Sequence, residues 1–477
     1  MHKLAIIGAG PSGLASAVAA IKEGLAPTLF EMSYRLGGVW GPDKRSIDDA
    51  STAWPGMRVN ISRHTGTFSD FSWPKEASDF PTTQEVYDYL CHYAQHHKLE
   101  RSIRFNSPII QIIPKDKHWL VRWQTDREQT QEESFDSVLI CTSKFSHPFI
   151  PPFQGLEKLK DNWLHSAKYR GPEPFNDKKV LVVGGSLSGT SIAEELAKIT
   201  SVTHLIRKER WMIKRYRSSD PKNNGPLLPR DLLKSYASAQ EVLSNEEHYQ
   251  RMLEHCAEQN ECPEWRMHPH SPVDFVIAEE YLHWVRIGKL KPVRGHIKHF
   301  NKTSLMLETG ERLDFDVVIF CTGYQRNLSF LPDALRLKSP LYEDTFPTDF
   351  KGIAFIGMYP GARGAVFPLA ELQAELACAV FSGRYTLPST EQMLKEIAET
   401  PTHRDEVQFT LSLAERLGIA PNPDSFPPGI RRLLIHGAYT PARFRLTGKH
   451  SNPAMALDLI KETACHRRQL LRSKNKE

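Results

Sequence analysis

The sequence lacks the features that mark membrane proteins, disulfide-bonded secreted proteins and nucleic-acid-binding proteins. Its 477 residues contain no uninterrupted apolar run of the roughly 18–20 residues that a membrane span needs. Its seven cysteines are an odd number without a C-x-x-C pair, which indicates reduced thiols and not a disulfide framework. The net charge of +5 is too small to favour nucleic-acid binding. We therefore expect a cytoplasmic protein with no membrane anchor and no nucleic-acid partner.

The N-terminus imitates a signal peptide, because Lys3 precedes a short apolar run and an A-x-A pattern. Three glycines and a proline interrupt that run, and cleavage after Ala19 would destroy the glycine-rich turn at residues 8–13. We therefore expect no signal peptide.

The sequence also lacks a convincing Ser-His-Asp set, a pair of catalytic carboxylates or a metal-ligand spacing. Cys141 and Cys321 each end an apolar run, but neither has the cysteine partner that a disulfide reductase needs. The histidines and cysteines between residues 255 and 270 fit no standard zinc pairing, so we expect no metal. These residues are His255, Cys256, Cys262, His268 and His270.

Two glycine-rich turns are the most informative features that the sequence does contain. The first, residues 8–13 (Gly-Ala-Gly-Pro-Ser-Gly), lies between an apolar run at 3–7 and a helical pattern. A strand, a tight turn and a helix N-terminus place backbone N–H groups against a pyrophosphate. Glu31 ends the next strand pattern, 23 residues after Gly8, close to the spacing at which an acidic side chain binds ribose hydroxyls. This turn predicts a dinucleotide site, which we assign to FAD.

The second turn, residues 184–189 (Gly-Gly-Ser-Leu-Ser-Gly), follows the apolar run 179–183 and precedes another helical pattern. Ser186 occupies the middle glycine position, which weakens this motif on its own. The next strand pattern, 202–206, ends in basic residues, and a guanidinium pairs well with a 2′-phosphate. These residues are Arg207, Lys208 and Arg210. We predict NADPH at this turn, with a solvated basic edge as the alternative.

The order of these patterns predicts an α/β fold with two Rossmann-like dinucleotide-binding domains. The apolar runs 136–141 and 314–321 resemble each other, and we expect both to return the chain to the first domain. The NADPH domain would then be inserted in the FAD domain. The expected boundaries are 1–165 for the first part of the FAD domain, 172–315 for the NADPH domain with a helical insertion at about 215–285, and 316–477 for the second part of the FAD domain with a C-terminal extension.

Further short motifs follow along the chain: residues 37–40 (Gly-Gly-Val-Trp), 321–324 (Cys-Thr-Gly-Tyr), 367–373 (Phe-Pro-Leu-Ala-Glu-Leu-Gln), 387–389 (Leu-Pro-Ser) and 444–448 (Phe-Arg-Leu-Thr-Gly). With the first turn and Glu31, these segments resemble the flavin-containing monooxygenases over nearly the whole length. Several separate matches in the family's order are much stronger than any one of them alone.

This resemblance implies the site residues. Asn60 matches the family's asparagine beside the reactive edge of the flavin, where a neutral amide can donate a hydrogen bond without supplying an acidic proton. A turn asparagine is the alternative, as an ordinary core position is for Trp40. The residues expected to bind the cofactors are Gly8, Gly10, Pro11, Ser12, Gly13, Glu31, Gly38, Val39, Trp40, Thr322, Gly323, Gln373, Gly184, Ser186, Ser188, Gly189, Arg207 and Lys208.

The resemblance also implies the reaction. NADPH would reduce FAD, and the reduced flavin would form a C4a-hydroperoxide with O2 that gives one oxygen atom to a soft nucleophile, an amine nitrogen or a sulfide sulfur, of a small molecule. A Baeyer–Villiger oxygenase and an NADPH oxidase are the enzymatic alternatives. A non-catalytic dinucleotide-binding redox sensor or scaffold is the alternative of another class. The substrate stays open, as does a homodimer.

Overall fold

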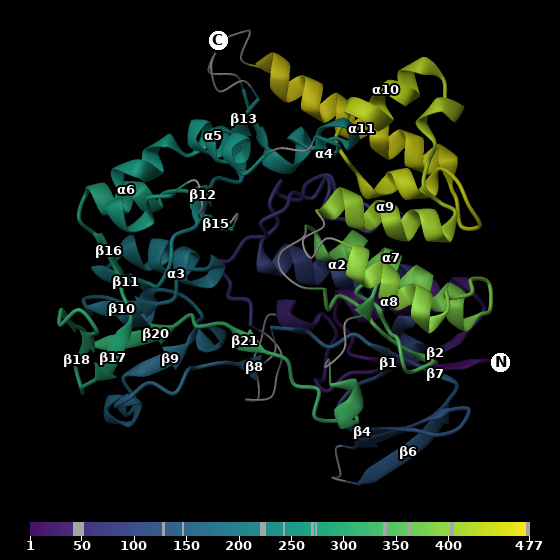
Figure 1. Ribbon diagram of the computed structural model, residues 1–477, viewed down its shortest axis with the longest axis horizontal. Helices are drawn as coiled ribbons and strands as arrows, with labels where there is room; N and C mark the ends of the chain where they lie inside the picture. Colours follow the sequence, from purple (N-terminus) through teal and green to yellow (C-terminus); the bar gives the residue numbers. More distant parts are fainter. Residues whose placement is uncertain are drawn as a thin grey trace.

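Two parallel five-stranded sheets form the cores of the molecule and lie on opposite sides of the view in Figure 1. The computed structural model describes residues 1–41, 52–125, 129–145, 147–219, 226–241, 244–268, 271, 274–336, 341–359, 364–400 and 405–473. His270, one of the residues weighed above for zinc, lies outside the described residues.

Each sheet is built around a strand that enters a glycine turn. In the first sheet, β1 lies between β2 and β7, and in the second, β10 lies between β11 and β20. The order of the first sheet is β24 (Ile353–Phe355), β7 (Ser137–Ile140), β1 (Lys3–Ile7), β2 (Ala26–Phe30) and β3 (Ile103–Arg104). The order of the second is β9 (Trp163–His165), β20 (Val317–Phe320), β10 (Val180–Val183), β11 (Val202–Ile206) and β16 (Leu290–Arg294).

The two units repeat one plan. In each, a helix follows the turn: α1 (Pro11–Lys22) in the first unit and α3 (Leu187–Ala197) in the second. In each, a three-stranded antiparallel sheet also precedes a strand of the parallel sheet, β7 in the first unit and β20 in the second. The antiparallel strands are β4 (Ile109–Pro114), β5 (Trp119–Gln124) and β6 (Thr130–Phe135), then β17 (Ile297–Phe300), β18 (Ser304–Leu307) and β19 (Arg312–Asp314). The second sheet uses only strands between residues 163 and 320, whereas the first uses strands on both sides of that range. The expected α/β fold, with one unit inserted in the other, is confirmed.

One expectation about this topology is wrong. The run 314–321 does not return the chain to the first sheet, because β20 pairs with β10 and β9 in the second. Strand β9, at the end of the expected first segment, also belongs to the second sheet. A fully buried strand has the same apolar composition in either sheet, so its sequence does not name its neighbours. The second unit therefore extends past both expected boundaries, because it includes β9, which ends at residue 165, and β20, which begins after residue 316. The assignment of the units to FAD and NADPH stays a prediction.

Helices cover the first sheet on the right of Figure 1. Helix α7 (Val366–Phe381) is buried along most of its length because it packs between α1 and α9 (Glu406–Leu417). Helix α2 (Thr83–His96) begins with a capping box between Thr82 and Glu85. The remaining helices here are α8 (Thr390–Glu399), α10 (Pro428–His436) and α11 (Pro453–Ser473). Among the described residues, no helix combines the length and apolarity that crossing a bilayer requires.

The expected helical insertion is mixed in structure. Within it, β15 (Phe275–Ile277) is a strand, which pairs in parallel with β12 (Trp211–Ile213) just before the insertion. The other elements are β13 (Tyr216–Ser218), β14 (Leu227–Pro229), α4 (Tyr236–Ala239), α5 (Asn245–His255) and α6 (Tyr281–Arg286). Short strands elsewhere are β8 (His147–Pro148), β21 (Tyr324–Gln325), β22 (Leu341–Tyr342) and β23 (Phe346–Pro347).

A buried ionic cluster ties the C-terminal region to the first unit. The Arg445 guanidinium donates to Glu371 Oε1 over 2.8 Å, to Glu375 and, over 2.6 Å, to Ser69 Oγ. Burial raises the pKa of Glu371 to about 6 despite the neighbouring cation. Because these groups are shielded from water, each depends on the others to satisfy its charge or hydrogen bonds.

Candidate functional site

The first glycine turn joins β1 to α1, and close approaches require its glycines. Gly8 has a φ of +104°, in the left-handed region that favours glycine. A Cβ on Gly13 would lie 1.8 Å from the carbonyl oxygen of Gly8, so no larger residue fits there. Gly10 is the N-cap of α1 and Pro11 its first residue. The N–H groups of the first helical turn, Ser12 included, have no partner within the helix and are available to an anion.

Glu31 lies beside this turn, as its spacing predicts. Its Oε2 accepts a hydrogen bond from Ala9 N over 2.8 Å, and its Oε1 accepts one from Ser33 N over 2.9 Å. The carboxylate is buried at the carboxyl end of β2, where units of this kind bind ribose. The structure thus brings Glu31 and the residue 8–13 turn together.

The loop at residues 37–40 folds against the same turn. Gly37 N donates to Ala9 O over 2.9 Å, and a Cβ on Gly38 would lie 3.2 Å from the Cα of Gly10. Residues 38–40 form a 3-10 helix, in which the carbonyl of Val39 accepts bonds from the N–H groups of residues 52 and 53. Trp40 is half-buried and packs against the core of the first unit. The predicted loop therefore borders the first turn.

Gln373 supports this turn indirectly. Its side chain is buried, accepts a hydrogen bond from Gly357 N over 2.9 Å and donates to Thr345 Oγ1 over 3.0 Å. A Cβ on Gly357 would lie 2.4 Å from Ser12 Oγ, so this amide holds the Gly357 backbone against the start of α1. Gln373 is therefore engaged by the protein, and it acts on the turn through Gly357.

Thr322 and Gly323 follow β20 and therefore lie with the second sheet, not the first. The Thr322 hydroxyl donates to Phe149 O over 2.6 Å, and His165 Nε2 lies 3.0 Å from Gly323 O. Gly323 has a φ of +96°, and a Cβ added to it would meet no other atom closely.

The second turn repeats the first in its backbone. Gly184 has a φ of +123°, and a Cβ on Gly189 would lie 1.7 Å from the carbonyl oxygen of Gly184. Ser186 is the N-cap of α3 with a φ of −104°, an ordinary extended conformation that needs no glycine. Ser188 lies in the first turn of that helix. The serine that makes this motif imperfect therefore leaves the backbone geometry intact.

A buried hydrogen-bonded chain underlies this turn, and sequence reasoning missed it. His204 Nε2 lies 3.0 Å from Gly184 O, and His204 Nδ1 lies 2.7 Å from the hydroxyl of Tyr281. Trp265 Nε1 donates to that hydroxyl over 3.3 Å. Burial lowers the pKa of His204 to about 4, so the ring is neutral at pH 7. A neutral ring that donates to Gly184 O must accept from Tyr281, which fixes its tautomer.

The predicted basic residues divide into two groups. Arg210 is engaged by the protein, because it donates to Asp274 over 2.7 Å and to the carbonyl of Gly185 over 3.0 Å. Arg207 is exposed and Lys208 is half-buried at the carboxyl end of β11. Within the described ranges, neither makes an ion pair. Both are therefore available to a phosphate, whereas Arg210 braces the turn.

Asn60 lies where the two units meet. Arg215, from the segment between β12 and β13, donates to Asn60 Oδ1 over 3.1 Å and to Val59 O over 2.9 Å. Arg230 donates to the backbone carbonyl of Asn60 over 2.6 Å. These contacts fix the amide with its oxygen toward Arg215, and its NH2 group has no partner in the part of the chain that the structure describes. The two arginines carry no motif, so only the fold reveals them.

The segment that carries Asn60, residues 52–82, also contacts α3. Trp54 Nε1 donates to Glu195 Oε2 over 2.7 Å, and a Cβ on Gly56 would lie 2.3 Å from Glu195 Oε1. Asp231 accepts from the hydroxyls of Ser62, over 2.5 Å, and Thr65, over 2.6 Å. This segment is therefore held by the second unit through these contacts, and by α7 of the first unit through the bonds of Ser69 to Glu371.

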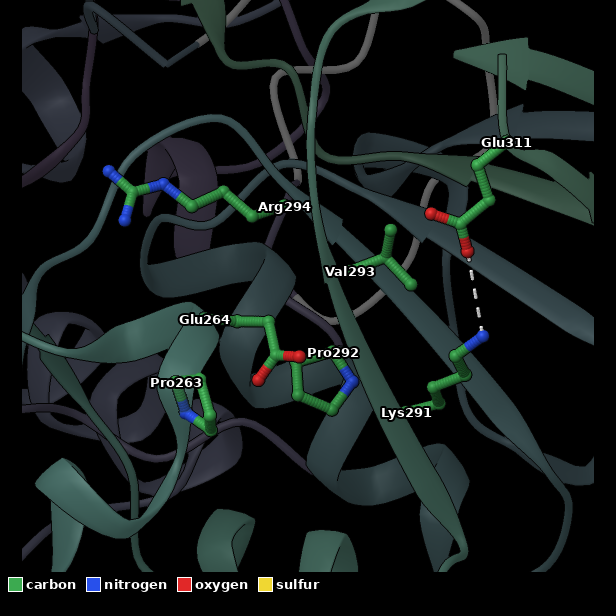
Figure 2. Close-up of a pocket in the computed structure, with 7 residues that line it drawn as sticks. All are labelled: Pro263, Glu264, Lys291, Pro292, Val293, Arg294 and Glu311. Atoms are coloured by element: carbon green, nitrogen blue, oxygen red, sulfur yellow. Dashed lines mark ion pairs between the residues drawn. The ribbon is translucent and has the colours of Figure 1, made fainter. Parts of the chain in front are cut away.

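A separate cavity of about 340 Å³ lies along the edge strand β16, and Figure 2 shows Lys291 facing Glu311 there at 3.7 Å. Its lining contains none of the predicted site residues. The lining residues are Pro263, Glu264, Lys291, Pro292, Val293, Arg294 and Glu311.

Comparison with known proteins gives one consistent result. A family model described as flavin-binding monooxygenase-like matches residues 1–416. Flavin-containing monooxygenase 5 of Oryctolagus cuniculus is 29% identical over 487 residues, which cover 94% of this chain and 89% of the relative. Dimethylaniline monooxygenase [N-oxide-forming] 4 of Rattus norvegicus is also 29% identical, over 94% of this chain and 84% of the relative.

A solved structure shares the fold. S-allyl-L-cysteine S-oxygenase from Allium sativum superposes with a TM-score of 0.62 at 21% identity, over 97% of this chain and 98% of that one. The agreement extends across both nucleotide units.

Proposed function

The chain belongs to the flavin-binding monooxygenase-like family and is an FAD- and NADPH-dependent monooxygenase, and we propose that it transfers one oxygen atom of O2 to an amine nitrogen or a sulfide sulfur of a small molecule. Two similar proteins are named as an N-oxide-forming monooxygenase and an S-oxygenase, which supports this class of soft nucleophile.

The two glycine turns fit the two cofactors. Each is a cradle that a Cβ would fill, because the last glycine of each turn lies against the carbonyl of the first. Each also opens at a helix N-terminus, which favours a pyrophosphate. Glu31 would bind the ribose of FAD, and Arg207 and Lys208 would bind the 2′-phosphate of NADPH. These roles follow from the charges at the ends of β2 and β11.

Bound FAD supplies the redox chemistry, accepting a hydride from NADPH and then activating O2. What the chain contributes is position and a neutral hydrogen-bond donor. The observation that carries this proposal is the orientation of Asn60, whose oxygen is occupied by Arg215 so that its NH2 group remains to donate. A neutral amide donor stabilises a developing negative charge on oxygen without protonating it.

The experiment that tests this proposal is rapid mixing of the reduced protein with O2, followed by turnover with amines and thioethers. We expect the absorbance of the flavin–oxygen adduct that the sequence implies, and its decay to accelerate when an amine or a thioether is added. Prompt reoxidation with stoichiometric H2O2, unaffected by any nucleophile, would contradict the proposal. Turnover of ketones alone would indicate a Baeyer–Villiger oxygenase instead.

Asn60→Ala should release H2O2 about tenfold faster than the native protein. The reason is that the variant lacks the amide that would donate to the oxygen bound at the flavin, and losing a hydrogen bond to a charged group has an effect of about this size. The matched control is Asn422→Ala, at an exposed asparagine near α10. Equal H2O2 release by Asn60→Ala and the native protein would exclude the proposed role of this amide.

A further inference from the structure

Two histidines and an aspartate meet where the segment that carries Asn60 contacts α11: His64 and Asp79 belong to that segment, and His466 belongs to the helix. His64 Nε2 lies 3.3 Å from Asp79 Oδ1, and His466 Nε2, on α11, lies 3.8 Å from the same oxygen. The two imidazole rings stack with centroids 4.5 Å apart. One candidate ligand atom from each residue lies within 4.8 Å of the others.

One of these atoms lacks a hydrogen-bond partner. His466 Nε2 is buried and makes no hydrogen bond, although a buried polar nitrogen is normally paired. Its position, close to one oxygen of Asp79 and beside the ring of His64, is the one that a shared cation would explain.

The aspartate has the outer contact that a metal ligand usually has. The Tyr216 hydroxyl, on β13, donates to Asp79 Oδ2 over 3.1 Å, which leaves Oδ1 turned toward the histidines. The Tyr216 ring packs edge-on against Phe80 at 5.1 Å, which fixes it in place. A hydrogen bond to the second oxygen of a ligating carboxylate orients it and increases metal affinity.

We propose that His64, Asp79 and His466 bind a Zn²⁺ ion, with a water molecule as the fourth ligand. Two imidazole nitrogens and one carboxylate oxygen form a typical three-residue zinc donor set. Bond lengths of about 2.0–2.2 Å in a tetrahedral site place ligand atoms about 3.3 Å apart. The His64–Asp79 distance of 3.3 Å already meets this spacing, and the His466–Asp79 distance of 3.8 Å exceeds it by about half an ångström.

This ion would join the C-terminal helix to the segment that carries Asn60. Figure 1 shows the end of α11 beside β13, the strand of Tyr216, and α11 also contacts β14. The Arg63 guanidinium, 3.9 Å from Asp79 Oδ1, opposes a cation at this oxygen. Removing the charge of Arg63 should therefore strengthen Zn²⁺ binding, whereas removing a ligand should weaken it.

The test is titration of the FAD-loaded full-length protein with Zn²⁺ alone, by calorimetry and by competition with a chromogenic chelator. We expect one equivalent to bind and His466→Gln to weaken it at least tenfold, with the flavin spectrum unchanged. Tyr216→Phe should weaken it about tenfold, as loss of an outer contact does. Arg63→Gln should strengthen it. His118→Gln, at an exposed histidine after β4, is the matched control and should bind as the native protein does.

Binding of Co²⁺ in place of Zn²⁺ should give the visible absorption of a four-coordinate site, and His466→Gln should lose it. Because His466 lies on the terminal helix, this variant should fold even if His64→Gln does not. The proposal is overturned if the native protein binds no Zn²⁺, or if it and His466→Gln bind Zn²⁺ with the same affinity.

Discussion

The two glycine turns of this protein have the same backbone but different surroundings. In each, the first glycine has a positive φ and the last lies against its carbonyl, with a Cβ-to-oxygen distance of 1.8 Å in the first turn and 1.7 Å in the second. The first turn is held by the carboxylate of Glu31 and by the loop at residues 37–40. The second is held by the neutral ring of His204 and by the guanidinium of Arg210.

This difference separates two tasks that a dinucleotide motif performs. The glycines set the backbone that receives a pyrophosphate, and they are needed wherever a Cβ would collide. The group that ends the following strand, Glu31 in one unit and Arg207 with Lys208 in the other, sets the charge that the nucleotide meets. Ser186 replaces a glycine at the position where φ is ordinary, so it changes neither task.

The largest effect should come from replacing the last glycine of each turn. Gly13→Ala and Gly189→Ala both place a Cβ inside the contact radius of a carbonyl oxygen, at a cost of about 3 kcal/mol or more. We expect Gly13→Ala to lose FAD, and Gly189→Ala to keep FAD but lose reduction by NADPH. The measurements are the flavin absorbance and the rate of anaerobic reduction.

Gly429→Ala, on α10 with open space around the added Cβ, is the control and should behave as the native protein. Loss of FAD from Gly189→Ala as well would show that the turns are not independent, and the comparison would fail.

The second effect is a pH dependence of stability that arises at the second turn, from His204. The pKa of His204 is lowered from 6.5 to about 4 in the folded protein, so the unfolded chain binds the extra proton between these values. The free energy of unfolding that depends on this neutral ring is fully present above pH 6.5. It falls by about 3 kcal/mol in total as the pH is lowered toward 4. Urea unfolding at a series of pH values should show a steeper loss in the native protein than in His204→Gln. Identical slopes for the two proteins would contradict the buried neutral histidine.

The third effect is on the choice of nucleotide. Replacing Arg207 and Lys208 together by Ala should raise KM for NADPH about ten- to a hundredfold, since hydrogen bonds to charged groups contribute about 1.5–3 kcal/mol. KM for NADH should change little, because NADH has no 2′-phosphate. Lys302→Ala, at an exposed lysine between β17 and β18, is the control. Equal changes for both nucleotides would favour a solvated basic edge.

The smallest effect should come from repairing the imperfect motif. Ser186→Gly should change KM for NADPH by less than about threefold, because the serine side chain caps nothing and N-cap Ser-to-Gly changes cost a few tenths of a kcal/mol. The reverse change in the first turn, Gly10→Ser, should also change FAD binding by less than about threefold, because Gly10 has a φ of −76° and its added Cβ would lie 3.7 Å from the Cα of Gly38, an ordinary contact distance. A large gain from Ser186→Gly would mean that the second turn is strained after all.

The sequence could predict features that are local. The turns, Glu31, the helix after Thr82 and the basic end of β11 are each encoded within about 30 residues, where spacing and chemistry are visible. The partner of β20 is not encoded in this way, because apolar strands of similar composition fit either sheet. The Arg215–Asn60 contact and the His204–Tyr281 contact join residues far apart in the chain, and neither arginine nor tyrosine carries a signal of its role. Those parts of the site depend on tertiary packing.

The buried cluster around Arg445 has a practical consequence for how this protein can be shortened. The family match ends at residue 416, but the arginine that neutralises Glu371 and Glu375 lies beyond it. Cutting the chain at that boundary would leave two carboxylates inside helix α7 without their cation, and losing one partner of a buried pair costs about 3–5 kcal/mol. Chimeras and shortened forms made from this family should therefore take their last junction after residue 448, so that the buried charges travel with the helix they serve.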